Sequence, residues 1–427
     1  MSAEIASLRQ SLQIYKGLVE VSVLINSITD YDELLRAILD VARRVILAEA
    51  ASLFFVNERT DALDLAISSF AEGQFTQPKI SVPRGKGIAG WVAEHGEGLL
   101  IPDAYADDRF YKDADRQTGF RTRSILCVPL KRDGDVIGVL QILNPKDKAA
   151  FDSQDLDGFT AYATLTATAI EKLRALERTR AQERVARDLA IAADIQQELL
   201  SRALPDNIPG AVFAAHNEAA SDVGGDFFNV QATNPYETYF AIADVSGKGI
   251  AASLLMAQTI SAMQFVFSST TSPADALTKL NATMYDRIVR GMFVTALIGR
   301  ITPSTGRIEL ASAGHCRPIL IRANGTAVEI ETEGSLPLGI MPKVAYRQGK
   351  VDVSKGDWLV GYTDGLSESR TGDDSDAFFD KKIVSTLNGR THSSPRAIID
   401  LLLTAEREHR GSGRQLDDLT ILVGGLA

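Results

Sequence analysis

Cysteine and histidine are scarce in this sequence. There are two cysteines, Cys127 and Cys316, and five histidines in 427 residues. The two cysteines fall in different halves of the chain, which excludes a disulfide framework and fits a reducing compartment. No grouping of cysteine and histidine suggests haem, an iron–sulfur cluster or a covalently attached chromophore. Such cofactors are therefore not expected.

Basic residues are fewer than acidic residues, and long apolar runs are also lacking. Lysine and arginine number 45 against 55 aspartates and glutamates, which gives a net charge of −10. This excess of negative charge argues against general affinity for nucleic acid or for an anionic membrane. The N-terminus lacks the apolar core of a signal peptide, and no apolar run approaches the ~18 residues needed to span a bilayer. We expect a cytoplasmic protein without a membrane segment.

Glycine and proline are absent from residues 159–200, which predicts one long helix. The middle of this helix is too densely charged to be buried, so the helix must bridge two domains or pair with a second copy. A short coiled-coil seam follows, formed by Val185, Leu189, Ala192, Gln196 and Leu199. We expect a homodimeric helical linker over residues 159–204, and a lone solvated helix is the alternative.

The region before the linker mixes helices and strands. Residues 1–28 have helical periodicity and predict an N-terminal helix that contributes to the dimer. A second helix, with apolar residues up to Ile46, begins with a capping-box-like pair, Thr29 and Asp32. Strand-like runs follow at residues 51–56, 64–68, 123–130 and 136–143. Asp133-Gly134 predicts a hairpin between the last two.

The region after the linker, residues 205–427, predicts a second domain. Its strand-like runs are residues 238–245, 293–301, 307–314, 318–323 and 357–362. Amphipathic helices are expected near residues 250–267, 273–290 and 395–409. Because the helices come in pairs and the strands in runs, we expect a layered α+β sandwich and not a doubly wound parallel sheet.

One loop of this domain, AIADVSGKG at residues 241–249, places a carboxylate before two glycines and a lysine. A phosphate-binding P-loop is excluded because its glycine spacing and its hydroxyl residue are missing. Asp244 alone fits a turn or helix cap, but four more aspartates stand at similar strand–turn junctions: Asp226, Asp364, Asp417 and Asp418. Acidic oxygens without histidine or cysteine select a hard ion, Mg²⁺ or Mn²⁺.

Six motifs in order carry a resemblance to a known family. They are GGDFFNV, IADVSGKGIAASLLMA, SAGHCRPIL, SLPLGI, LVGYTDGLSES and DDLTILV. In this order they resemble the SpoIIE-like branch of the PPM metal-dependent protein serine/threonine phosphatases, over about residues 185–427. The resemblance implies an αββα sandwich with two Mn²⁺ or Mg²⁺ ions between the sheets. It also implies a phosphorylated protein substrate, usually a small STAS-domain anti-anti-sigma regulator.

The resemblance also implies a role for each aspartate. Asp244 would bridge both ions and the backbone carbonyl of Val245 would join one of them. Asp226 would bind one ion, and Asp364 and Asp417 the other. Asp418 stands beside the last ligand, so which member of that pair binds stays open, with Asp417 preferred. These four aspartates, Asp226, Asp244, Asp364 and Asp417, are the candidate catalytic residues, because paired ions activate a water molecule for attack on phosphorus.

Three nearby residues have two interpretations each. His315 could donate a proton to the leaving oxygen, but a structural histidine held by its loop is favoured. Lys248 could meet the substrate phosphate or be a solvated loop lysine. Cys316, where the family usually has a polar residue, is expected to be a small buried residue and not a nucleophile.

The first half resembles a GAF domain, a sensor with a central antiparallel sheet, over about residues 18–170. The motifs are GKGIAGWVAEHGEGLLIPDAYADDRF, GFRTRSILCVPL, VIGVLQILN and FDSQDL. Cyclic-nucleotide-binding members carry an Asn-Lys, Phe, Asp-Glu signature, which is matched in part by Asn144, Lys146, Phe151 and Asp155, with Pro145 interrupting it and Leu156 replacing the glutamate. The domain either binds a small molecule or is an empty dimerisation module.

Two further interpretations concern this first domain. Asp107, Asp108 and Arg109 are expected to form an ion pair or helix cap, and Trp91 is expected to pack under the sheet. Together the patterns predict a GAF sensor, a helical transmitter and a metal-dependent protein phosphatase. A non-catalytic phosphoprotein-binding or nucleotide-responsive scaffold is the alternative.

Overall fold

The structure is a computed structural model that describes residues 16–427, except 18, 21, 24–26, 72, 73, 78, 111, 113, 114, 116–119, 290 and 372–379. The chain divides into two compact units, Met1–Glu183 and Arg184–Ala427. Each is described by itself. The expected helix over residues 1–28 falls largely outside the described residues.

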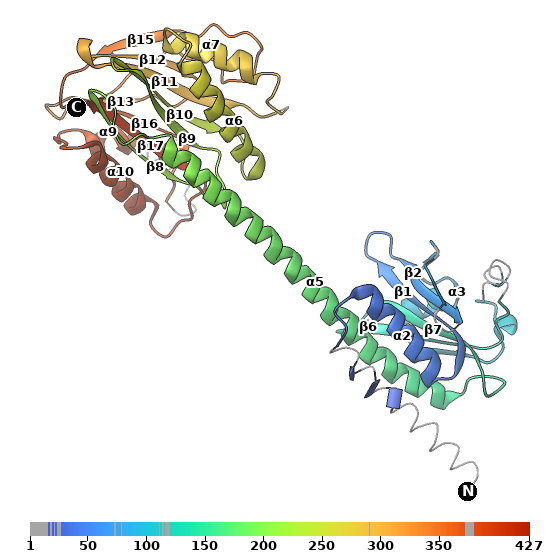
Figure 1. The fold of residues 1–427 in the computed structure, drawn as a ribbon. Helices are drawn as coiled ribbons and strands as arrows, with labels where there is room; N and C mark the ends of the chain where they lie inside the picture. Colours follow the sequence, from blue (N-terminus) through green and yellow to red (C-terminus); the bar gives the residue numbers. More distant parts are fainter. Residues whose placement is uncertain are drawn as a thin grey trace. The chain divides into compact units, whose positions relative to one another are not determined.

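The first unit is built on one antiparallel sheet with the order β3-β2-β1-β7-β6-β5, and β4 pairs with β2 (Figure 1). Its strands are β1 Ala48–Asn57, β2 Ala62–Ala71, β3 Gln74–Thr76, β4 Ser81–Pro83, β5 Leu99–Ile101, β6 Ile125–Arg132 and β7 Asp135–Pro145. The helices are α2 Tyr31–Val45, α3 Gly87–His95 and the start of α5. One apolar cluster joins the sheet to α2 and α5, and another joins it to α3. This is the expected central antiparallel sheet.

Local sequence explains two turns of this unit. Asp133 and Gly134 both have positive φ and connect β6 to β7 in the predicted hairpin. The start of α2 differs from the prediction, because the N-cap is Asp30, whose side chain accepts a hydrogen bond from the backbone N–H of Glu33. Aspartate accepts this bond as well as threonine does, and it stands one residue closer to the apolar face.

The linker helix α5 runs from Ser153 to Arg202, so it starts earlier than the sequence predicted. Its start is a reciprocal capping pair. The N–H of Asp155 donates to Oδ1 of Asp152 at 3.1 Å, and the N–H of Asp152 donates to Oδ2 of Asp155 at 2.9 Å. Residues 175–188 are exposed on all faces of the helix, as their charge density predicts.

The second unit contains two five-stranded antiparallel sheets with the orders β15-β12-β11-β10-β9 and β14-β13-β16-β17-β8 (Figure 1). Its strands are β8 Ala211–Glu218, β9 Phe227–Asn234, β10 Glu237–Val245, β11 Val294–Thr302, β12 Arg307–Ala313, β13 Ile319–Ile321, β14 Ala327–Glu329, β15 Gln348–Asp352, β16 Trp358–Tyr362 and β17 Leu419–Leu426. The helices are α6 Ile250–Phe267, α7 Pro273–Met284, α8 Asp364–Ser367, α9 Asp380–Leu387 and α10 Pro395–Arg410. Helices α6 and α7 cover the first sheet, and α9 and α10 cover the second. The predicted αββα sandwich is confirmed.

Two glycines let the sheets pack closely. A Cβ atom on Gly299 would lie 2.0 Å from the ring of Phe240, and one on Gly424 would lie 2.2 Å from the ring of Phe213. The two rings fill this space and contact each other with a centroid distance of 5.4 Å. The centre of the sandwich is therefore an aromatic contact between the two sheets.

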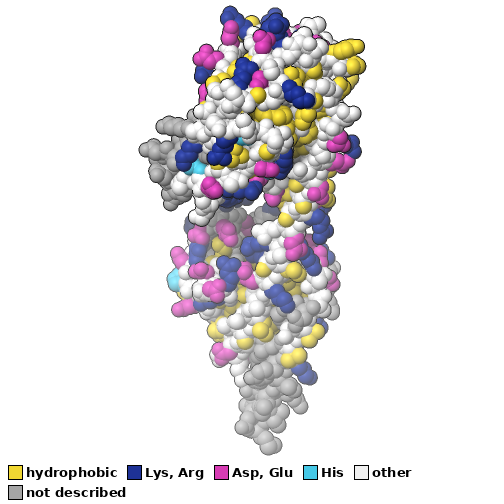
Figure 2. All heavy atoms as spheres, turned by 90° about the vertical axis from the view of Figure 1, so that its left-hand side faces the viewer, with side chains coloured by type: hydrophobic (Ala, Val, Ile, Leu, Met, Phe, Trp, Pro, Cys, Tyr) yellow, Lys and Arg dark blue, Asp and Glu magenta, His cyan; other side chains and the backbone are white. Residues whose placement is uncertain are grey.

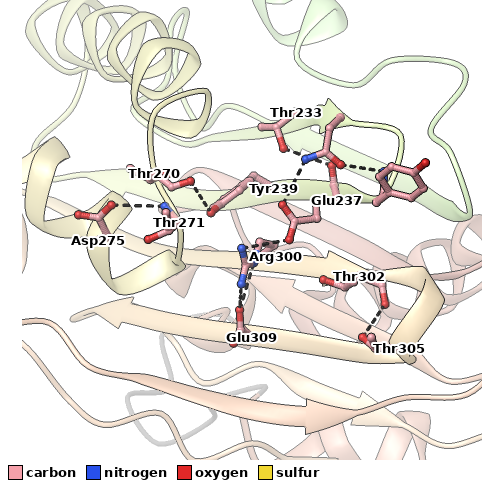
Figure 3. Close-up of polar contacts among 12 residues, drawn as sticks. Thr233, Glu237, Tyr239, Thr270, Thr271, Asp275, Arg300, Thr302, Thr305 and Glu309 are labelled. Atoms are coloured by element: carbon pink, nitrogen blue, oxygen red, sulfur yellow. Dashed lines mark hydrogen bonds and ion pairs between the residues drawn. The ribbon is translucent and has the colours of Figure 1, made fainter.

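A polar network joins neighbouring strands of the first sheet (Figure 3). The Arg300 guanidinium binds Glu309 of β12 and lies 3.2 Å from a carboxylate oxygen of Glu237 of β10. It also lies 5.9 Å from the centroid of the Tyr239 ring. Because Arg300 and Glu237 stand at the ends of their strands away from Asp244, this network stabilises the sheet without entering the candidate site.

The expectation that no segment is apolar enough to span a membrane is wrong for α6. This helix has 18 residues with a mean hydropathy of 1.6, so it qualifies by length and composition, although 44% of its residues are buried inside the second unit. A helix packed against a sheet and another helix meets the same criteria. On the face drawn in Figure 2, acidic and basic side chains are interspersed.

Candidate metal centre

The predicted acidic residues stand at one edge of the sandwich. Asp244 lies near the end of β10, and Asp226 directly precedes the neighbouring antiparallel strand β9. In the second sheet, Asp364 follows β16 as the first residue of α8, and Asp417 and Asp418 precede the antiparallel neighbour β17. Since β17 also packs against β9 and β10, these strand ends meet. The fold therefore brings all five aspartates to one place.

Close backbone contacts tie the four motifs together. A Cβ atom on Gly225 would lie 2.8 Å from the carbonyl oxygen of Val245, and one on Gly365 would lie 1.9 Å from the carbonyl oxygen of Asp418. One on Gly224 would lie 2.6 Å from Oδ2 of Asp418. At Gly225 and Gly365 the obstructing atom belongs to the backbone and cannot turn away, whereas at Gly224 the Asp418 carboxylate would have to move. The glycines beside the aspartates are therefore required by packing of one motif on another.

Asp226 and Asp244 form the buried part of the cluster. Asp226 is 1% exposed, and its Oδ2 accepts a hydrogen bond from the hydroxyl of Thr363 at 2.6 Å. Burial, and then the charge of Asp244, raise the pKa of Asp226 well above its usual value. Burial and the charge of Asp364 raise the pKa of Asp244 to about 7, although a hydrogen bond links its carboxyl group to that of Asp226.

Asp364 and Asp417 are closer to solvent. Burial, followed by the charges of Asp417 and Glu368, raises the pKa of Asp364. Oδ2 of Asp417 lies 3.2 Å from Nζ of Lys248, which also donates a hydrogen bond to the carbonyl oxygen of Leu416. Lys248 thus neutralises part of the cluster while its side chain stays half exposed, which agrees with the expectation of a solvated loop lysine.

Asp418 has a different environment from its neighbour. Its Oδ1 accepts a hydrogen bond from the N–H of Ala220 at 2.8 Å, and its Oδ2 accepts one from the N–H of Gly225 at 2.6 Å. Both carboxylate oxygens therefore hold the loop that carries Asp226. This arrangement favours Asp417 as the member of the pair that faces an ion.

The donor set fits a hard divalent ion in chemistry. The oxygen atoms come from carboxylates and from the carbonyl of Val245, which are the ligands that such ions prefer. The carboxylates repel one another, and a bound cation would remove this repulsion. Among the residues that the structure describes, no three acidic, histidine or cysteine side chains are arranged so that they could hold an ion as they stand. Oδ2 of Asp226 accepts a hydrogen bond from Thr363, and Oδ2 of Asp417 is paired with Lys248.

The alternative that Asp244 caps the next helix is not supported. The N-cap of α6 is Gly249, without a capping side chain. Gly247 and Gly249 have φ values of 92° and 77°, where only glycine is unstrained, and a Cβ atom on either would meet nothing within 4 Å. These glycines therefore shape an open loop beside the cluster and do not pack against another segment.

His315 and Cys316 lie behind the aspartates. Nδ1 of His315 and the hydroxyl of Thr295 share a hydrogen bond of 2.9 Å, and Thr295 stands opposite Asp244 in the sheet. Burial lowers the pKa of His315 to about 4, so the ring is neutral near pH 7. Burial, with the charge of Asp364, raises the pKa of the Cys316 thiol to about 12. A structural role fits both residues.

Sequence reasoning did not identify the partner of Gln196 at this site. The side-chain amide of Gln196 in α5 donates to the carbonyl oxygen of Gly224 at 2.8 Å and accepts from the N–H of Gly224 at 3.1 Å. Gln196 is 9% exposed, whereas it was expected on a coiled-coil seam. Leu199 and Leu200 also pack on the core of the second unit. Gln196 and Leu199 of the predicted seam therefore make their contacts within the same chain.

The partial nucleotide signature of the first unit is structural. Oδ1 of Asn144 accepts hydrogen bonds from the N–H groups of Arg123 and Ser124, and its Nδ2 donates to the carbonyl oxygen of Arg121. Lys148, and not Lys146, pairs with Asp155 at 2.6 Å. These contacts hold strands and the start of α5, and none of them points to a ligand.

The remaining interpretations for the first unit can also be compared with the structure. Asp107 and Arg109 form the expected ion pair at 2.7 Å. Trp91 is only partly buried, and it stacks on His95 at 4.0 Å on α3, because the helix presents it at its solvent edge. The expectation that it packs under the sheet holds only in part.

Comparison with known proteins supports two domains. The family model of the stage II sporulation protein E matches residues 234–425, and the GAF domain model matches residues 30–170. Among curated proteins, a probable 3',5'-cyclic phosphodiesterase from Caenorhabditis elegans is 35% identical over 153 residues, which are 34% of this chain and 21% of that protein. A dual-specificity cyclic nucleotide phosphodiesterase from Takifugu rubripes is 41% identical over 117 residues, which are 25% of this chain and 13% of that one. This chain thus spans only about a fifth or less of these relatives.

A solved structure shares the fold of the second unit. The SiaA-PP2C domain of Pseudomonas aeruginosa is 18% identical, with a TM-score of 0.51, and the match covers 58% of this chain and 99% of that one. The two family models, together with this fold, cover most of the chain. The chain is therefore a GAF domain followed by a SpoIIE-type protein phosphatase domain with a PP2C fold.

Proposed function

We propose that the protein is a cytoplasmic, metal-dependent protein serine/threonine phosphatase with Asp226, Asp244, Asp364 and Asp417 as its catalytic residues. The observation that carries the proposal is the meeting of these side chains at one edge of the sandwich, where each alters the protonation of another. Such a concentration of negative charge costs stability unless it serves a cation.

The four aspartates, with the carbonyl of Val245, hold two Mn²⁺ or Mg²⁺ ions in this proposal. When bound, the ions supply an activated water molecule and neutralise charge on the phosphoryl group. Asp244 is placed between the other carboxylates, since the charges of Asp364 and Asp417 both act on it and its carboxyl group bonds to Asp226. Asp418 serves the site indirectly, by fixing the loop that carries Asp226.

The substrate in this proposal is a phosphoserine or phosphothreonine on a partner protein, with a STAS-domain regulator as the expected class. This assignment follows from the SpoIIE-type family, and the loop at Gly247 and Gly249 beside the aspartates is not covered by another segment. Neither nucleic acid nor a membrane is part of the proposed function.

Control of activity is proposed to pass through α5. Gln196 binds both backbone polar groups of Gly224, and Gly224 lies two residues before Asp226. A shift of this helix end would therefore move one metal-binding residue. A ligand in the GAF domain, or pairing of two copies through the N-terminal and linker helices, would supply the shift. Val185, Ile191 and Ile195 are exposed on α5 and are available for pairing within a homodimer.

The test compares metal-stripped wild-type protein with Asp244→Asn on a phosphoserine protein after addition of Mn²⁺. Release of phosphate by the wild type and its loss in the variant are expected. Asp352→Asn is a matched control, because Asp352 is an exposed aspartate on β15. It should behave as the wild type. Binding of Mn²⁺ measured by calorimetry gives a second readout, in which Asp244→Asn weakens binding.

A non-catalytic scaffold is the competing function. It predicts that the protein binds a phosphoprotein without Mn²⁺-dependent release of phosphate, and that Asp244→Asn changes nothing. If the wild type releases no phosphate from any phosphoserine or phosphothreonine protein while still binding Mn²⁺, the catalytic proposal fails.

A further inference from the structure

A cleft of about 190 Å³ opens beside the acidic cluster. Lys248, Gly365 and Asp417 line it and also border the candidate metal centre. Its other wall comes from the end of α10 and the loop between α10 and β17. Pockets for separate small molecules usually measure ~300–1,000 Å³. The smaller cleft therefore suits a side chain of a bound protein better than a free metabolite.

The charges of the cleft are mostly paired. Four basic side chains line it, Lys248, Arg370, Arg410 and Arg414, against three acidic ones. Arg410 binds the buried Glu406, with Nε donating to Oε1 at 2.8 Å, and Lys248 is paired with Asp417. Arg414 is exposed and has no hydrogen bond or ion pair with any residue that the structure describes. The cleft therefore offers a guanidinium to an incoming anion.

The loop that carries Arg414 is held on both sides. Nη1 of Arg410 donates to the carbonyl oxygen of Gly413 at 3.3 Å. On the other side, Nε2 of Gln415 donates to the carbonyl oxygens of Glu218 at 3.0 Å and Asp417 at 2.9 Å. These bonds fix the backbone of the loop. Binding of a partner therefore costs little further conformational entropy in the loop.

The base of the cleft is equally well fixed. Glu406 is 2% exposed and accepts a hydrogen bond from the hydroxyl of Ser369 at 2.6 Å, as well as the bond from Arg410. Ser369 belongs to the segment that follows α8, the helix that begins with Asp364. A buried, fully paired carboxylate therefore joins the wall of the cleft to the candidate metal centre.

We propose that Arg414 in this cleft binds an acidic side chain of the phosphoprotein substrate, close in sequence to its phosphorylated residue. The inference rests on the proposed function. Since Asp417 borders both sites, a substrate chain whose phosphate lies at the aspartates places a residue a few positions away in the cleft. A guanidinium binds a carboxylate through two parallel hydrogen bonds, which makes it selective for this partner.

The experiment uses the full-length protein with Mn²⁺ and two phosphoserine peptides that differ only beside the phosphoserine. One carries aspartates and the other alanines at the three positions on each side. Wild-type kcat/KM should favour the aspartate peptide by about fivefold, the worth of one exposed ion pair. Arg414→Ala should bring the ratio near one, and Arg414→Glu should favour a third peptide with lysines.

A ratio measured within each variant does not depend on the amount of folded enzyme. Arg396→Ala is the matched control, because Arg396 is an exposed arginine at the other end of α10, paired with Asp400. It should keep the wild-type ratio.

Three outcomes overturn the inference. A wild-type ratio near one, or a ratio that survives Arg414→Ala, excludes charge selection by the cleft while the phosphatase activity stands. Absence of Mn²⁺-dependent release from every peptide rejects the proposed function, and the inference falls with it.

Discussion

At the residue scale, the candidate centre depends on glycines as much as on aspartates. Gly365 follows Asp364, and a Cβ atom there would lie 1.9 Å from the carbonyl oxygen of Asp418. No rotation of a side chain relieves this contact, because the obstructing atom belongs to the backbone. The position therefore fixes the distance between the segments that carry Asp364 and Asp417.

Gly365→Ala is expected to lower the free energy of unfolding of the phosphatase domain by about 1–3 kcal/mol, the usual cost of overpacking. It should also weaken Mn²⁺ binding, because the two segments must separate. Urea unfolding and calorimetric titration measure the two effects. Gly349→Ala in β15 is the control, since a Cβ atom there meets nothing within 4 Å. Equal stability of both variants would contradict the prediction.

Asp417 and Asp418 should respond differently to substitution. Asp418→Ala removes the acceptor of two short backbone hydrogen bonds in a buried site, so the domain should lose about 3 kcal/mol of stability without metal. Asp417→Ala removes a half-exposed partner of Lys248 and should cost less than about 1 kcal/mol. Mn²⁺ affinity should fall directly in Asp417→Ala. Thermal unfolding in the presence of a chelator measures stability, and Mn²⁺ titration measures affinity. If Asp417→Ala lost more stability and Asp418→Ala lost more Mn²⁺ affinity, the two roles would have to be exchanged.

The aspartates could be found from sequence because each stands where an apolar strand meets a glycine-rich turn. Gln196 and Arg414 could not. Gln196 carries no local signal of its partner, since Gly224 becomes its neighbour only through folding. Arg414 stands in a polar loop like many other arginines. It differs from them because it lines a cleft and forms no ion pair with a residue that the structure describes, and both properties depend on the tertiary structure.

At the scale of elements, α5 shows where periodicity succeeds and where it is overridden. The absence of glycine and proline predicted the helix, and its charged middle is exposed as expected. Its start was placed at residue 159, after Gly158, whereas the capping pair Asp152 and Asp155 begins the helix earlier. Near its end two residues of the predicted seam make contacts within the chain, because Gln196 binds Gly224 and Leu199 packs on the core of the phosphatase domain.

Gln196→Ala should loosen the contact between α5 and the loop before Asp226. The change leaves the N–H and carbonyl of Gly224 without these partners, at a cost of about 1–3 kcal/mol. Faster hydrogen exchange at Gly224 and Gly225 and a lower affinity for Mn²⁺ are expected.

Gln197→Ala provides the control, because Gln197 is the same residue type on the exposed side of the same helix turn. The contact has no role in the site if both variants exchange and bind Mn²⁺ alike.

At the scale of the whole molecule, the boundary between the compact units lies at Glu183 and Arg184, inside α5. The prolines after the helix predicted a domain start at residue 205, whereas the resemblance to the SpoIIE-like phosphatases already begins at about residue 185. The last turns of α5 nevertheless belong to the core of the second unit, where Leu200 is 2% exposed. A local break in the chain is thus a poor guide to where packing ends.

A fragment of residues 184–427 should therefore be more stable than one of residues 205–427. The shorter fragment loses Leu200 from the core and Gln196 from Gly224, at a combined cost of about 3–5 kcal/mol. Thermal unfolding of both fragments tests this, with Mn²⁺ titration as a second readout. Equal melting temperatures would show that the end of α5 adds nothing to the domain.

Two residues hold the loop at Gly224 and Gly225. Gln196 binds Gly224, and Asp418 accepts a hydrogen bond from the N–H of Gly225. Asp418 stands 193 positions after Gly225 in the chain. During synthesis, Gln196 and Gly224 leave the ribosome before Asp418 does. The linker helix can therefore hold this loop first, and Asp418 can hold it only after β17 has emerged.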